Sequence, residues 1–473
     1  MKNNLGKLQI FSITNEDALK KKRVDVEYYQ PFFEDVVKKV AGSKYGLQKL
    51  EDITLLISNG RTPSKDMYDE DNDQAGSVPI IKAGTASGRF VDLERLEYVK
   101  ADFANGKKAQ KGDIFILSAA HQASYVGKNV SILDVEPEQD TFFVGELICV
   151  RANPEKVLPE YLLGFLSSKI GYLLLNREKR GQTSHIYPED IKTIPLPVPS
   201  MKDQQKIVSI LNKAYAEKKK KEEEIKTILA SIDSFVLGEL GIEIERERER
   251  VAFAITSDEI EGRIDPFFYK PYFKTLQRAI ENKNYSELGE LVEFAKETWD
   301  QKSIFDNQFP YIEISNIDTS NGEIAKTDFV PVAEAPSRAK MVVREGDIIV
   351  STTRPNRGAI TPISREQDGF IASTGFAILR DLKDSKVLKD YLFVALRTSL
   401  SLRQMEQRTT GGNYPAITTE DLRKIKIVVP ELKTQEKIVA GVQTIYNKAR
   451  NLRQEAESVI AEAQKQTAEM IFA

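Results

Sequence analysis

A long helical pattern that occurs twice places the strongest constraint on how this chain can fold. The seam of a coiled coil needs apolar residues at alternating steps of four and three. Residues 203–240 follow this spacing at Ile207, Leu211, Ala214, Lys218, Lys221, Ile225, Ile228, Ile232 and Phe235. The spacing returns 231 residues later at Ile438, Val442, Ile445, Ala449, Leu452, Ala456, Val459, Ala463 and Gln466. A helix of about 36 residues, roughly 54 Å long, cannot bury such a seam alone, so we expect the two helices to pair.

Short segments outside these helices recur in the same order, 230 to 240 residues apart. The recurring pairs are Arg23-Val24-Asp25 with Arg263-Ile264-Asp265, Gly112-Asp113-Ile114 with Gly346-Asp347-Ile348, Tyr161-Leu162 with Tyr391-Leu392, and Pro199 followed by Gln204 with Pro430 followed by Gln435. The offset drifts by only ten residues over most of a half. A single duplicated unit with small changes in loop length therefore accounts for the chain.

Each copy has the pattern of strands, a helix, further strands and then the long helix. Short β-branched or aromatic runs bounded by glycine predict strands at residues 111–118 and 345–352, and further strands are expected at 78–81, 142–151, 311–315 and 370–380. Residues 193–199 and 424–430 are expected at sheet edges, because the first segment holds three prolines.

The predicted fold class is α+β. It consists of two similar mixed α/β domains joined by two long helices that pack as an antiparallel coiled coil, with an internal pseudo-two-fold repeat. The expected boundaries are residues 1–200 and 242–431 for the two domains, and residues 201–241 and 432–473 for the helices.

The composition is that of a soluble globular protein, with 41% hydrophobic and 29% charged residues. The single cysteine, Cys149, excludes a disulfide framework, and the two histidines are too few for a Cys/His zinc cluster. Residues 1–10 lack the apolar run of a signal peptide, and no stretch of 18 apolar residues occurs. We therefore expect a cytoplasmic protein.

The overall charge argues against a uniformly basic surface. Lys and Arg number 68 against 71 Asp and Glu, for a formal charge of -3. A DNA-binding domain usually carries an excess of positive charge, so any such site must lie in local patches. Residues 243–250 alternate Glu and Arg, and we interpret them as a solvated face because their charges cancel.

No catalytic or metal-binding pattern is present in the sequence. There is no Gly-x-x-x-x-Gly-Lys-[Ser/Thr] loop for nucleotide phosphates, and no pair of motifs typical of a methyltransferase. Asp190-Ile191-Lys192 has the acid-x-Lys spacing of a nuclease but lacks an upstream Pro-Asp, so a helix cap is the better interpretation of Asp190. His121 and His185 lack a paired acid or nucleophile, which excludes a triad.

The segments between the shared ones differ sharply between the two copies. Residues 58–65 read Ser-Asn-Gly-Arg-Thr-Pro-Ser-Lys, whereas residues 296–302 read Lys-Glu-Thr-Trp-Asp-Gln-Lys. After the Gly-Asp-Ile segment, residues 119–125 and 352–358 are equally unlike. One scaffold with independent loops is typical of two recognition heads that bind different things.

The duplicated order of a variable head, a Gly-x-x-x-x-Ile segment, Pro-x-x-x-x-Gln-x-x-Ile and a long helix resembles the specificity subunit of type I restriction-modification enzymes. The resemblance covers both halves. It implies a non-enzymatic DNA reader, in which residues 1–200 and 242–431 are target-recognition domains that each read one half of a split, asymmetric site. The second head lacks a counterpart of Gly60-Arg61-Thr62-Pro63, so contacts cannot be transferred from one head to the other.

The resemblance also implies partners. The two helices would set the spacer between the half-sites and dock two methyltransferase subunits, which carry S-adenosylmethionine and methylate adenine. Endonuclease and translocase subunits join such complexes. This chain itself would bind no cofactor and no metal.

Direct readout of bases needs amide, hydroxyl and guanidinium groups on protruding loops, and each good bidentate contact discriminates by about 1–3 kcal/mol. The candidate DNA-binding residues of the first head are Arg61, Lys65, Lys82, Arg89, His121, Gln122, Tyr125, Lys128, Arg177, Lys179, Arg180, Gln182, Thr183, His185 and Tyr187. Those of the second head are Trp299, Lys302, Asn316, Arg354, Asn356, Arg357, Arg403, Arg408, Asn413 and Tyr414. The clusters at 177–187 and 403–414 are the strongest candidates, because phosphate-binding charge adjoins base-reading groups there.

Two other classes of protein remain open from the sequence. The chain could be a non-catalytic scaffold whose heads bind proteins and whose coiled coil dimerises, or an enzyme in which a methyltransferase is fused to a recognition domain. The basic, amide-rich loops at equivalent positions of the two copies argue against the scaffold, and salt-dependent retention on DNA would discriminate between the two, because phosphate contacts weaken steeply with ionic strength. The absence of a cofactor loop argues against the enzyme.

Overall fold

The computed structural model describes residues 11–14, 16, 18–19, 23–69, 76–103, 107–120, 123–181, 184–244, 252–256, 260, 263–303 and 305–472. The chain divides into two compact units. The first comprises Met1–Lys219 with Ala456–Ala473, and the second comprises Lys220–Glu455. Each unit therefore contains one head together with part of both long helices.

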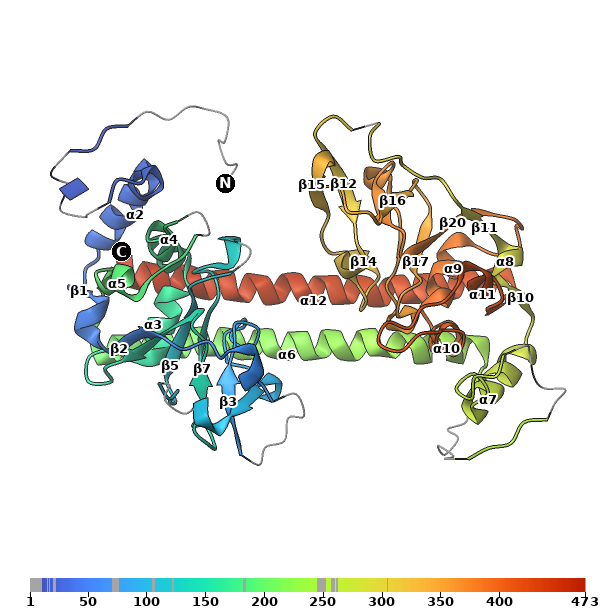
Figure 1. Ribbon diagram of the computed structural model, residues 1–473, viewed down its shortest axis with the longest axis horizontal. Coiled ribbons are helices and arrows are strands. Elements are labelled where there is room, and N and C mark those ends of the chain that lie inside the picture. The colour runs from blue at the N-terminus through green and yellow to red at the C-terminus, as the bar shows by residue number, and fades with distance from the viewer. Residues whose placement is uncertain are drawn as a thin grey trace. The chain divides into compact units, whose positions relative to one another are not determined.

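The long helices α6 (Met201–Leu240) and α12 (Leu432–Phe472) lie side by side (Figure 1). In the second unit, Lys221 pairs with Glu455 at 2.6 Å, Glu224 with Lys448 at 2.9 Å, and Glu239 with Lys437 at 2.7 Å. Residue numbers rise along α6 while those of their partners fall along α12. The pair is therefore antiparallel, which confirms the predicted coiled coil.

The predicted seam is the one on which the two helices meet. Ile225 packs in one buried cluster with Ala449 and Leu452. Near the end of α6, the partly exposed Phe235 ring lies against Gly441 of α12, and its neighbour Val236 belongs to the buried core of the second unit. At the other end of α12, Gln466 is exposed and Thr467 is buried. The polar interruption at Lys221 is explained by its ion pair with Glu455.

We expect two helical glycines to respond oppositely to alanine. A Cβ on Gly441 would lie 2.3 Å from Cζ of Phe235, whereas a Cβ on Gly238 would meet nothing within 4 Å. Gly238→Ala should stabilise the protein by about 0.5–1 kcal/mol, because alanine favours the helix. Gly441→Ala should lose that gain and lower the melting temperature, because the Phe235 ring must leave its packed position. Equal upward shifts in thermal denaturation would contradict this packing.

The described residues of the first head form three sheets, of which the smallest is the pair of β1 and β9. The four-stranded sheet has the order β2-β8-β5-β6 with all neighbours antiparallel, and the three-stranded sheet has the order β4-β3-β7, in which β3 and β7 are parallel. The strands are β1 (Leu47–Lys49), β2 (Thr54–Asn59), β3 (Ser77–Ile81), β4 (Glu97–Lys100), β5 (Asp113–Leu117), β6 (Val130–Ile132), β7 (Phe142–Phe143), β8 (Leu147–Ala152) and β9 (Pro195–Pro197). The helices of the head are α2 (Pro31–Ala41), α3 (Pro159–Leu166), α4 (Lys169–Arg177) and α5 (Pro188–Lys192).

The second head repeats this topology, with a fourth strand, β16, in the sheet that matches β4-β3-β7 and with a separate hairpin of β13 and β14. Its sheets have the orders β11-β20-β17-β18 and β15-β12-β19-β16, and β12 and β19 are the parallel pair. The strands are β10 (Tyr285–Glu287), β11 (Val292–Ala295), β12 (Gln308–Ile312), β13 (Ile317–Asp318), β14 (Glu323–Ile324), β15 (Asp328–Pro331), β16 (Ala339–Val342), β17 (Ile348–Ser351), β18 (Ile360–Pro362), β19 (Ile371–Ser373), β20 (Phe376–Leu382) and β21 (Lys426–Val428). The helices are α7 (Pro271–Glu281), α8 (Leu288–Leu291), α9 (Lys389–Leu396), α10 (Ser399–Gln407) and α11 (Thr419–Arg423). Two similar α/β heads confirm the predicted fold class.

Two predicted strands are each divided in the structure. Residues 142–151 form β7 and β8, and residues 370–380 form β19 and β20, with a break at Gly145 and Gly375. In each head the two halves belong to different sheets, so this segment crosses from one sheet to the other. The segments expected at sheet edges contain the strands β9 and β21, which each form a two-stranded pair, with β1 and β10 respectively.

A buried ion pair explains the recurring Gly-Asp-Ile segment. Asp113 is fully buried and accepts hydrogen bonds from Nε and Nη2 of Arg151 at 2.7 and 2.8 Å. The equivalent Asp347 accepts from Nε and Nη2 of Arg380, both at 3.0 Å. Each pair ties the central strand of the four-stranded sheet to its neighbour.

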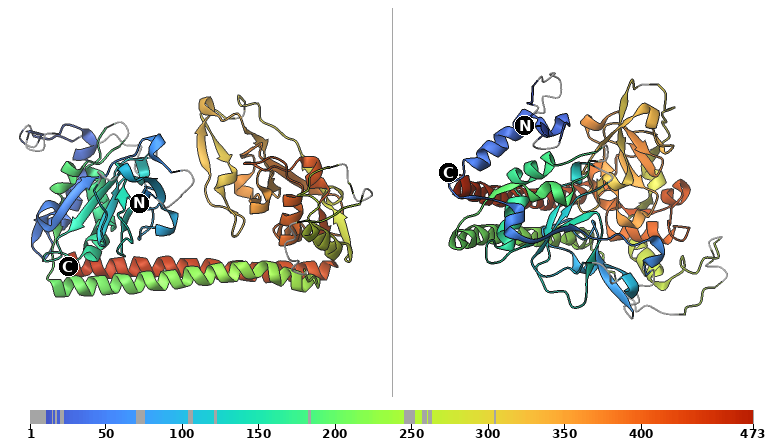
Figure 2. Two further views of the ribbon diagram at one scale, coloured as in Figure 1. Left: turned by 60° about the horizontal axis from the view of Figure 1, so that its bottom comes forward. Right: turned by 60° about the vertical axis from the view of Figure 1, so that its left-hand side comes forward.

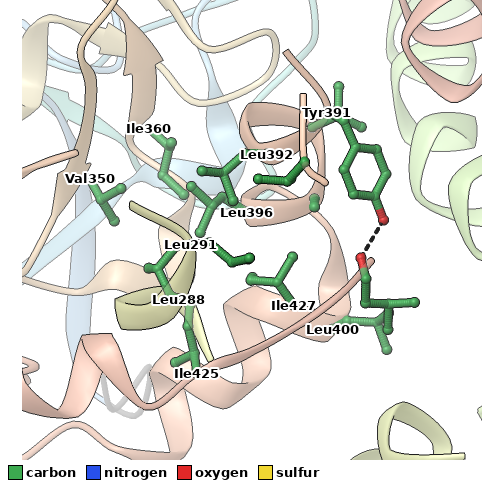
Figure 3. Packing of buried hydrophobic residues seen from close by; sticks show 14 of the residues in the cluster. Leu288, Leu291, Val350, Ile360, Tyr391, Leu392, Leu396, Leu400, Ile425 and Ile427 are labelled. Carbon is green, nitrogen blue, oxygen red and sulfur yellow. Dashed lines mark hydrogen bonds between the residues drawn. The ribbon is translucent and has the colours of Figure 1, made fainter. Parts of the chain in front are cut away.

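Each head also packs on the long helices within its own unit. Ile207 and Leu211 of α6 belong to the buried cluster around Tyr161 and Phe165 of α3 in the first unit. In the second unit, Ile438 of α12 belongs to the corresponding cluster. Figure 3 shows part of that second core, with the Tyr391 hydroxyl donating to a backbone carbonyl at 2.7 Å.

Candidate nucleic-acid interface

In the first head, two loops from distant parts of the sequence are joined at one edge of the four-stranded sheet. The loop after β5 and the loop after α4 meet where Ile186 N donates to Ser118 O at 3.0 Å. The end of β2 reaches the same place, because Asn59 Nδ2 donates to Ser118 Oγ at 3.3 Å and to Gly145 O at 2.8 Å. Residues 118–128 and 177–187 are called the paired loops of the first head.

The second head makes the same join. Ile417 N donates to Thr352 O at 2.9 Å, which links the loop after β17 to the loop after α10. Residues 352–358 and 403–416 are therefore the paired loops of the second head. The structure brings together, in each head, two loops that the sequence offered as separate candidates. Figure 2 shows the chain in two further views, in which the segments can be followed by colour.

One side-chain cluster in the first pair of loops centres on Arg180. Arg180 and His185 exchange two backbone hydrogen bonds of 2.9 Å, which close a tight turn. The Arg180 guanidinium lies 4.6 Å from the ring centroid of Tyr187, and the His185 ring stacks on the same ring. Arg180 Nε lies 3.0 Å from Asp190 Oδ2. Burial raises the pKa of the Asp190 carboxyl above its usual value, although Arg180 and Arg23 lower it.

In the second pair of loops, Arg354 holds the other loop through its backbone and its side chain. Its N donates to Pro415 O and its Nη2 to Asn413 O, both at 2.7 Å. Its guanidinium lies 4.7 Å from the ring centroid of Tyr414, a side chain that is 72% exposed. Arg354 has φ 48°, a left-handed conformation that costs a non-glycine residue about 1–3 kcal/mol and that often occurs at binding sites.

Arg23 supports the first pair of loops, and its role was not predicted from the sequence. We call this set of contacts the brace. Arg23 Nη1 and Nη2 donate to the carbonyls of Glu178 and Lys179 at 3.3 and 2.8 Å. The Tyr28 ring lies between two guanidinium groups, 4.4 Å from Arg23 and 4.2 Å from Arg177. Burial lowers the pKa of the Lys179 ammonium. Arg177 therefore supports the loop rather than standing free on its surface.

The second head repeats this brace. Arg263 Nη1 donates to Arg408 O at 3.3 Å, and the Phe268 ring lies 5.0 Å from Arg263 and 5.6 Å from Arg408. The recurring Arg-x-Asp segment was the available signal in the sequence. Its position next to the paired loops could not be foreseen, because more than 140 residues separate the partners.

The remaining candidates fall into four groups, of which the last lies in the interior. Several are exposed near strand ends or on the paired loops: Arg61, Lys65, Tyr125, Lys128, Lys302, Arg357, Asn413 and Tyr414. Others contact neighbouring protein groups: Lys82 with Glu97, Asn356 and Arg403 with Glu406, and Arg89 with Asn212 and the Tyr215 ring of α6. His121, Gln122, Gln182 and Thr183 lie outside the described residues.

Two candidates lie in the interior, which removes them from the proposed interface. Trp299 is 2% exposed and packs against Phe305 and Phe309. Asn316 is 6% exposed, and its amide donates to Asp328 Oδ2 at 3.2 Å while its carbonyl accepts from Glu313 N. Trp299 is enclosed in an aromatic cluster and Asn316 in a local turn, although the sequence alone suggested that both lie on the surface.

We expect Gly60→Ala to damage the first head only. A Cβ on Gly60 would lie 1.9 Å from Phe143 O, a backbone atom of β7 that cannot move independently. The resulting displacement of the Arg61 loop should cost about 1–3 kcal/mol and weaken any binding by this head. Gly84→Ala is the matched control, because a Cβ there meets nothing within 4 Å. Thermal denaturation measures both, and equal melting temperatures would contradict the close approach.

Among the residues that the structure describes, no group of three or more His, Cys, Asp or Glu side chains could hold a metal ion. None of the helices described is long and apolar enough to cross a membrane.

Two heads of one topology with different paired loops, each packed on a shared antiparallel helix pair, define a two-headed recognition protein. Comparison with protein families identifies the kind. The chain belongs to the family of the type I restriction modification DNA specificity domain, whose model matches residues 43–227 and again residues 280–460. The duplication and the resemblance inferred from the sequence are thereby confirmed.

Individual relatives carry matching names. The chain is 23% identical over 437 residues to a protein of Methanocaldococcus jannaschii named a putative type I restriction enzyme MjaX specificity subunit, covering 87% of this chain and 89% of that one. It is 24% identical over 169 residues to the type I restriction enzyme HindI specificity subunit of Haemophilus influenzae, a match that spans 35% of this chain and 36% of that protein.

Solved structures with related names are more distant. The HsdS subunit from Thermoanaerobacter tengcongensis gives a TM-score of 0.32 at 16% identity, covering 90% of this chain and 95% of that one. The S subunit of a type I restriction-modification system from M. genitalium gives 0.40 at 13% identity, covering 91% and 96%. At these scores the likeness supports no conclusion about the arrangement of the chain.

Proposed function

We propose that this chain is the DNA sequence-specificity subunit of a type I restriction-modification complex. Residues 1–200 and 242–431 act as target-recognition domains, and each reads one half of a bipartite, asymmetric DNA site. Residues 201–241 and 432–473, which contain α6 and α12, set the spacer and dock methyltransferase subunits. The family description, a DNA specificity domain that occurs twice in the chain, supports this role directly.

The observation that carries the proposal is the repeated join between the paired loops. The same backbone hydrogen bond links them in both heads, yet the side chains around it differ. The joined loops carry Arg180, Tyr187 and Lys128 in the first head, and Arg354, Asn413 and Tyr414 in the second. Guanidinium, amide and phenol groups are suited to phosphates and base edges, so two unlike heads fit two unlike half-sites.

The chain acts without catalysing a reaction itself. S-adenosylmethionine and the adenine-methylating chemistry belong to two methyltransferase subunits, and endonuclease or translocase subunits complete a restricting complex. A duplicated chain offers equivalent surfaces twice, which favours two copies of one partner over two different partners. Double-stranded DNA is the substrate, and the complex works in the cytoplasm.

The test is the genomic methylation pattern of cells with and without this chain. We expect methylation at a bipartite sequence to require both this polypeptide and its methyltransferase. A pattern that persists without this chain would reject the proposal. For the purified complex, retention on DNA should fall steeply with ionic strength. Retention insensitive to salt would favour the alternative of a scaffold with protein-binding heads.

A further inference from the structure

Two fully buried glutamines occupy equivalent places at the starts of the long helices. Gln204 of α6 and Gln435 of α12 are both 0% exposed. A buried amide costs free energy unless its donors and acceptor are all satisfied, and such groups specify geometry when they are. These two side chains therefore need a structural account.

In the first unit, the Gln204 side chain joins three segments of the chain. Its Oε1 accepts from Leu158 N at 2.8 Å, and its Nε2 donates to Pro199 O at 2.9 Å and to Lys156 O at 3.2 Å. Pro199 lies just beyond the last strand of the head, and residues 156–158 form the turn that enters α3. The amide thus ties the first turn of α6 to both sides of the head from which it emerges.

The second unit repeats this arrangement atom for atom. Gln435 Oε1 accepts from Leu388 N, and its Nε2 donates to Lys386 O and Pro430 O, all at 2.8 Å. The variable loops differ between the heads, but this contact does not. A feature that is identical in both halves serves a task that the two halves share.

A second buried contact fixes the same exit from each head. The Tyr161 hydroxyl donates to Pro197 O at 2.8 Å, and the Tyr391 hydroxyl donates to Val428 O at 2.7 Å. The strand that leads into each long helix is therefore pinned on two sides. With the strand and the entry turn both held, the helix can leave its head in one direction only.

We propose that Gln204 and Gln435 are positioning residues that fix the angle between each head and its helix, and thereby make the complex selective for one spacer length. This inference rests on the proposed function. Along 20 residues, or roughly 30 Å of helix, a rotation of about 10° at the base displaces the far end by about 5 Å. One base pair is only about 3.4 Å long, so a small loss of angular restraint admits neighbouring spacers.

The test compares each buried glutamine with an exposed one in the same helix. Gln204→Leu and Gln435→Leu remove the three hydrogen bonds, while Gln205→Leu and Gln443→Leu change exposed side chains. The full chain with its methyltransferase subunits is offered a DNA library in which the two half-sites stand at varied spacers. Methylation is read by sequencing, and folding by thermal denaturation.

We expect the buried-site variants to keep the same half-site bases but to lose discrimination between the preferred spacer and those one base pair longer or shorter. Loss of restraint equivalent to one buried hydrogen bond reduces that ratio by about tenfold. The exposed-site variants should retain the parental ratio. Gln204→Met and Gln435→Met keep the length of the side chain without its hydrogen bonds, so they should lose discrimination to the same degree and serve as the test if the leucine variants do not fold.

An unchanged spacer ratio in folded variants would overturn the inference. So would a uniform loss of methylation at all spacers, since that would mean that the glutamines contribute to stability alone. Failure of the proposed function has a different signature, because the unaltered chain would then produce no bipartite methylation at all.

Discussion

A seven-residue insertion in both long helices, after Lys221 in α6 and after Gln454 in α12, is expected to abolish methylation at the original spacer and to favour one about three base pairs longer. Seven residues add about 10.5 Å of helix, and three base pairs span about 10.2 Å. One heptad preserves the seam. Because the helices are antiparallel and Lys221 faces Glu455, both insertions fall at the same level of the pair.

The new optimum should be weaker than the original one. Three base pairs also turn the duplex by about 100°, at 10–10.5 base pairs per turn, so the second half-site presents a different face. The library of half-sites at varied spacers measures both effects. An insertion in α6 alone is the control, because it leaves α12 unmatched and should lower the melting temperature without creating a new optimum. A preferred spacer that stays the same or shortens would contradict the role of the helices.

Removing both Arg180 and Tyr187 is expected to abolish recognition of one half-site and to leave the other unchanged. Arg180 stacks on Tyr187 at the exposed end of the paired loops, so Arg180→Ala with Tyr187→Ala removes a charged group and an aromatic surface together. At about 1–3 kcal/mol for each contact, the two losses add to about 2–6 kcal/mol, or roughly 30-fold or more in affinity. The salt dependence of binding should also become shallower by about one phosphate contact.

Asp190→Asn separates a binding role of Arg180 from a structural one. Asp190 is the ion-pair partner of Arg180, and its carboxyl is partly buried. If Arg180 serves mainly to neutralise this carboxylate, Asp190→Asn with Arg180→Ala should restore recognition. If Arg180 contacts DNA, removing the charge of Asp190 does not replace that contact, and the double variant still fails to recognise the half-site. Restoration in that double variant, measured by methylation of each half-site, would remove Arg180 from the interface.

The helices and the duplication could be predicted because both follow from the spacing of residues in the sequence. Ile225, Ala449 and Leu452 lie on the seam that their periodicity indicates. The recurring Gly-Asp-Ile segment marks the start of β5 in the first head and of β17 in the second. Local spacing fails at Gln466, which is exposed although it continues the seam. It also failed to separate β7 from β8, because the turn between them, closed by the hydrogen bond from Leu147 N to Val144 O, is short and lies within an otherwise apolar run.

The contacts within the candidate site were beyond the sequence. Ser118 and Ile186 are joined by a hydrogen bond between backbone atoms, so no pattern of side chains in the sequence predicts this contact. Arg89 was chosen for its charge, but it stacks at 3.9 Å on Tyr215, which a helix more than a hundred residues away supplies. Trp299 was chosen as an aromatic residue in a variable loop, but Phe305 and Phe309 enclose it. Burial of this kind is decided by tertiary packing, and composition does not report it.

The hydrogen bond between the paired loops has a consequence for how such a chain can acquire new specificity. Every residue has a backbone carbonyl oxygen, and every residue except proline has a backbone amide proton. This hydrogen bond therefore tolerates nearly any replacement of the side chains beside it. The hydrogen bonds from Ile186 N to Ser118 O and from Ile417 N to Thr352 O would hold the loops in place while the loop side chains were replaced. Randomising Lys128, Arg180 and Tyr187 should therefore yield many folded variants with new preferences, which makes these loops a starting point for laboratory evolution.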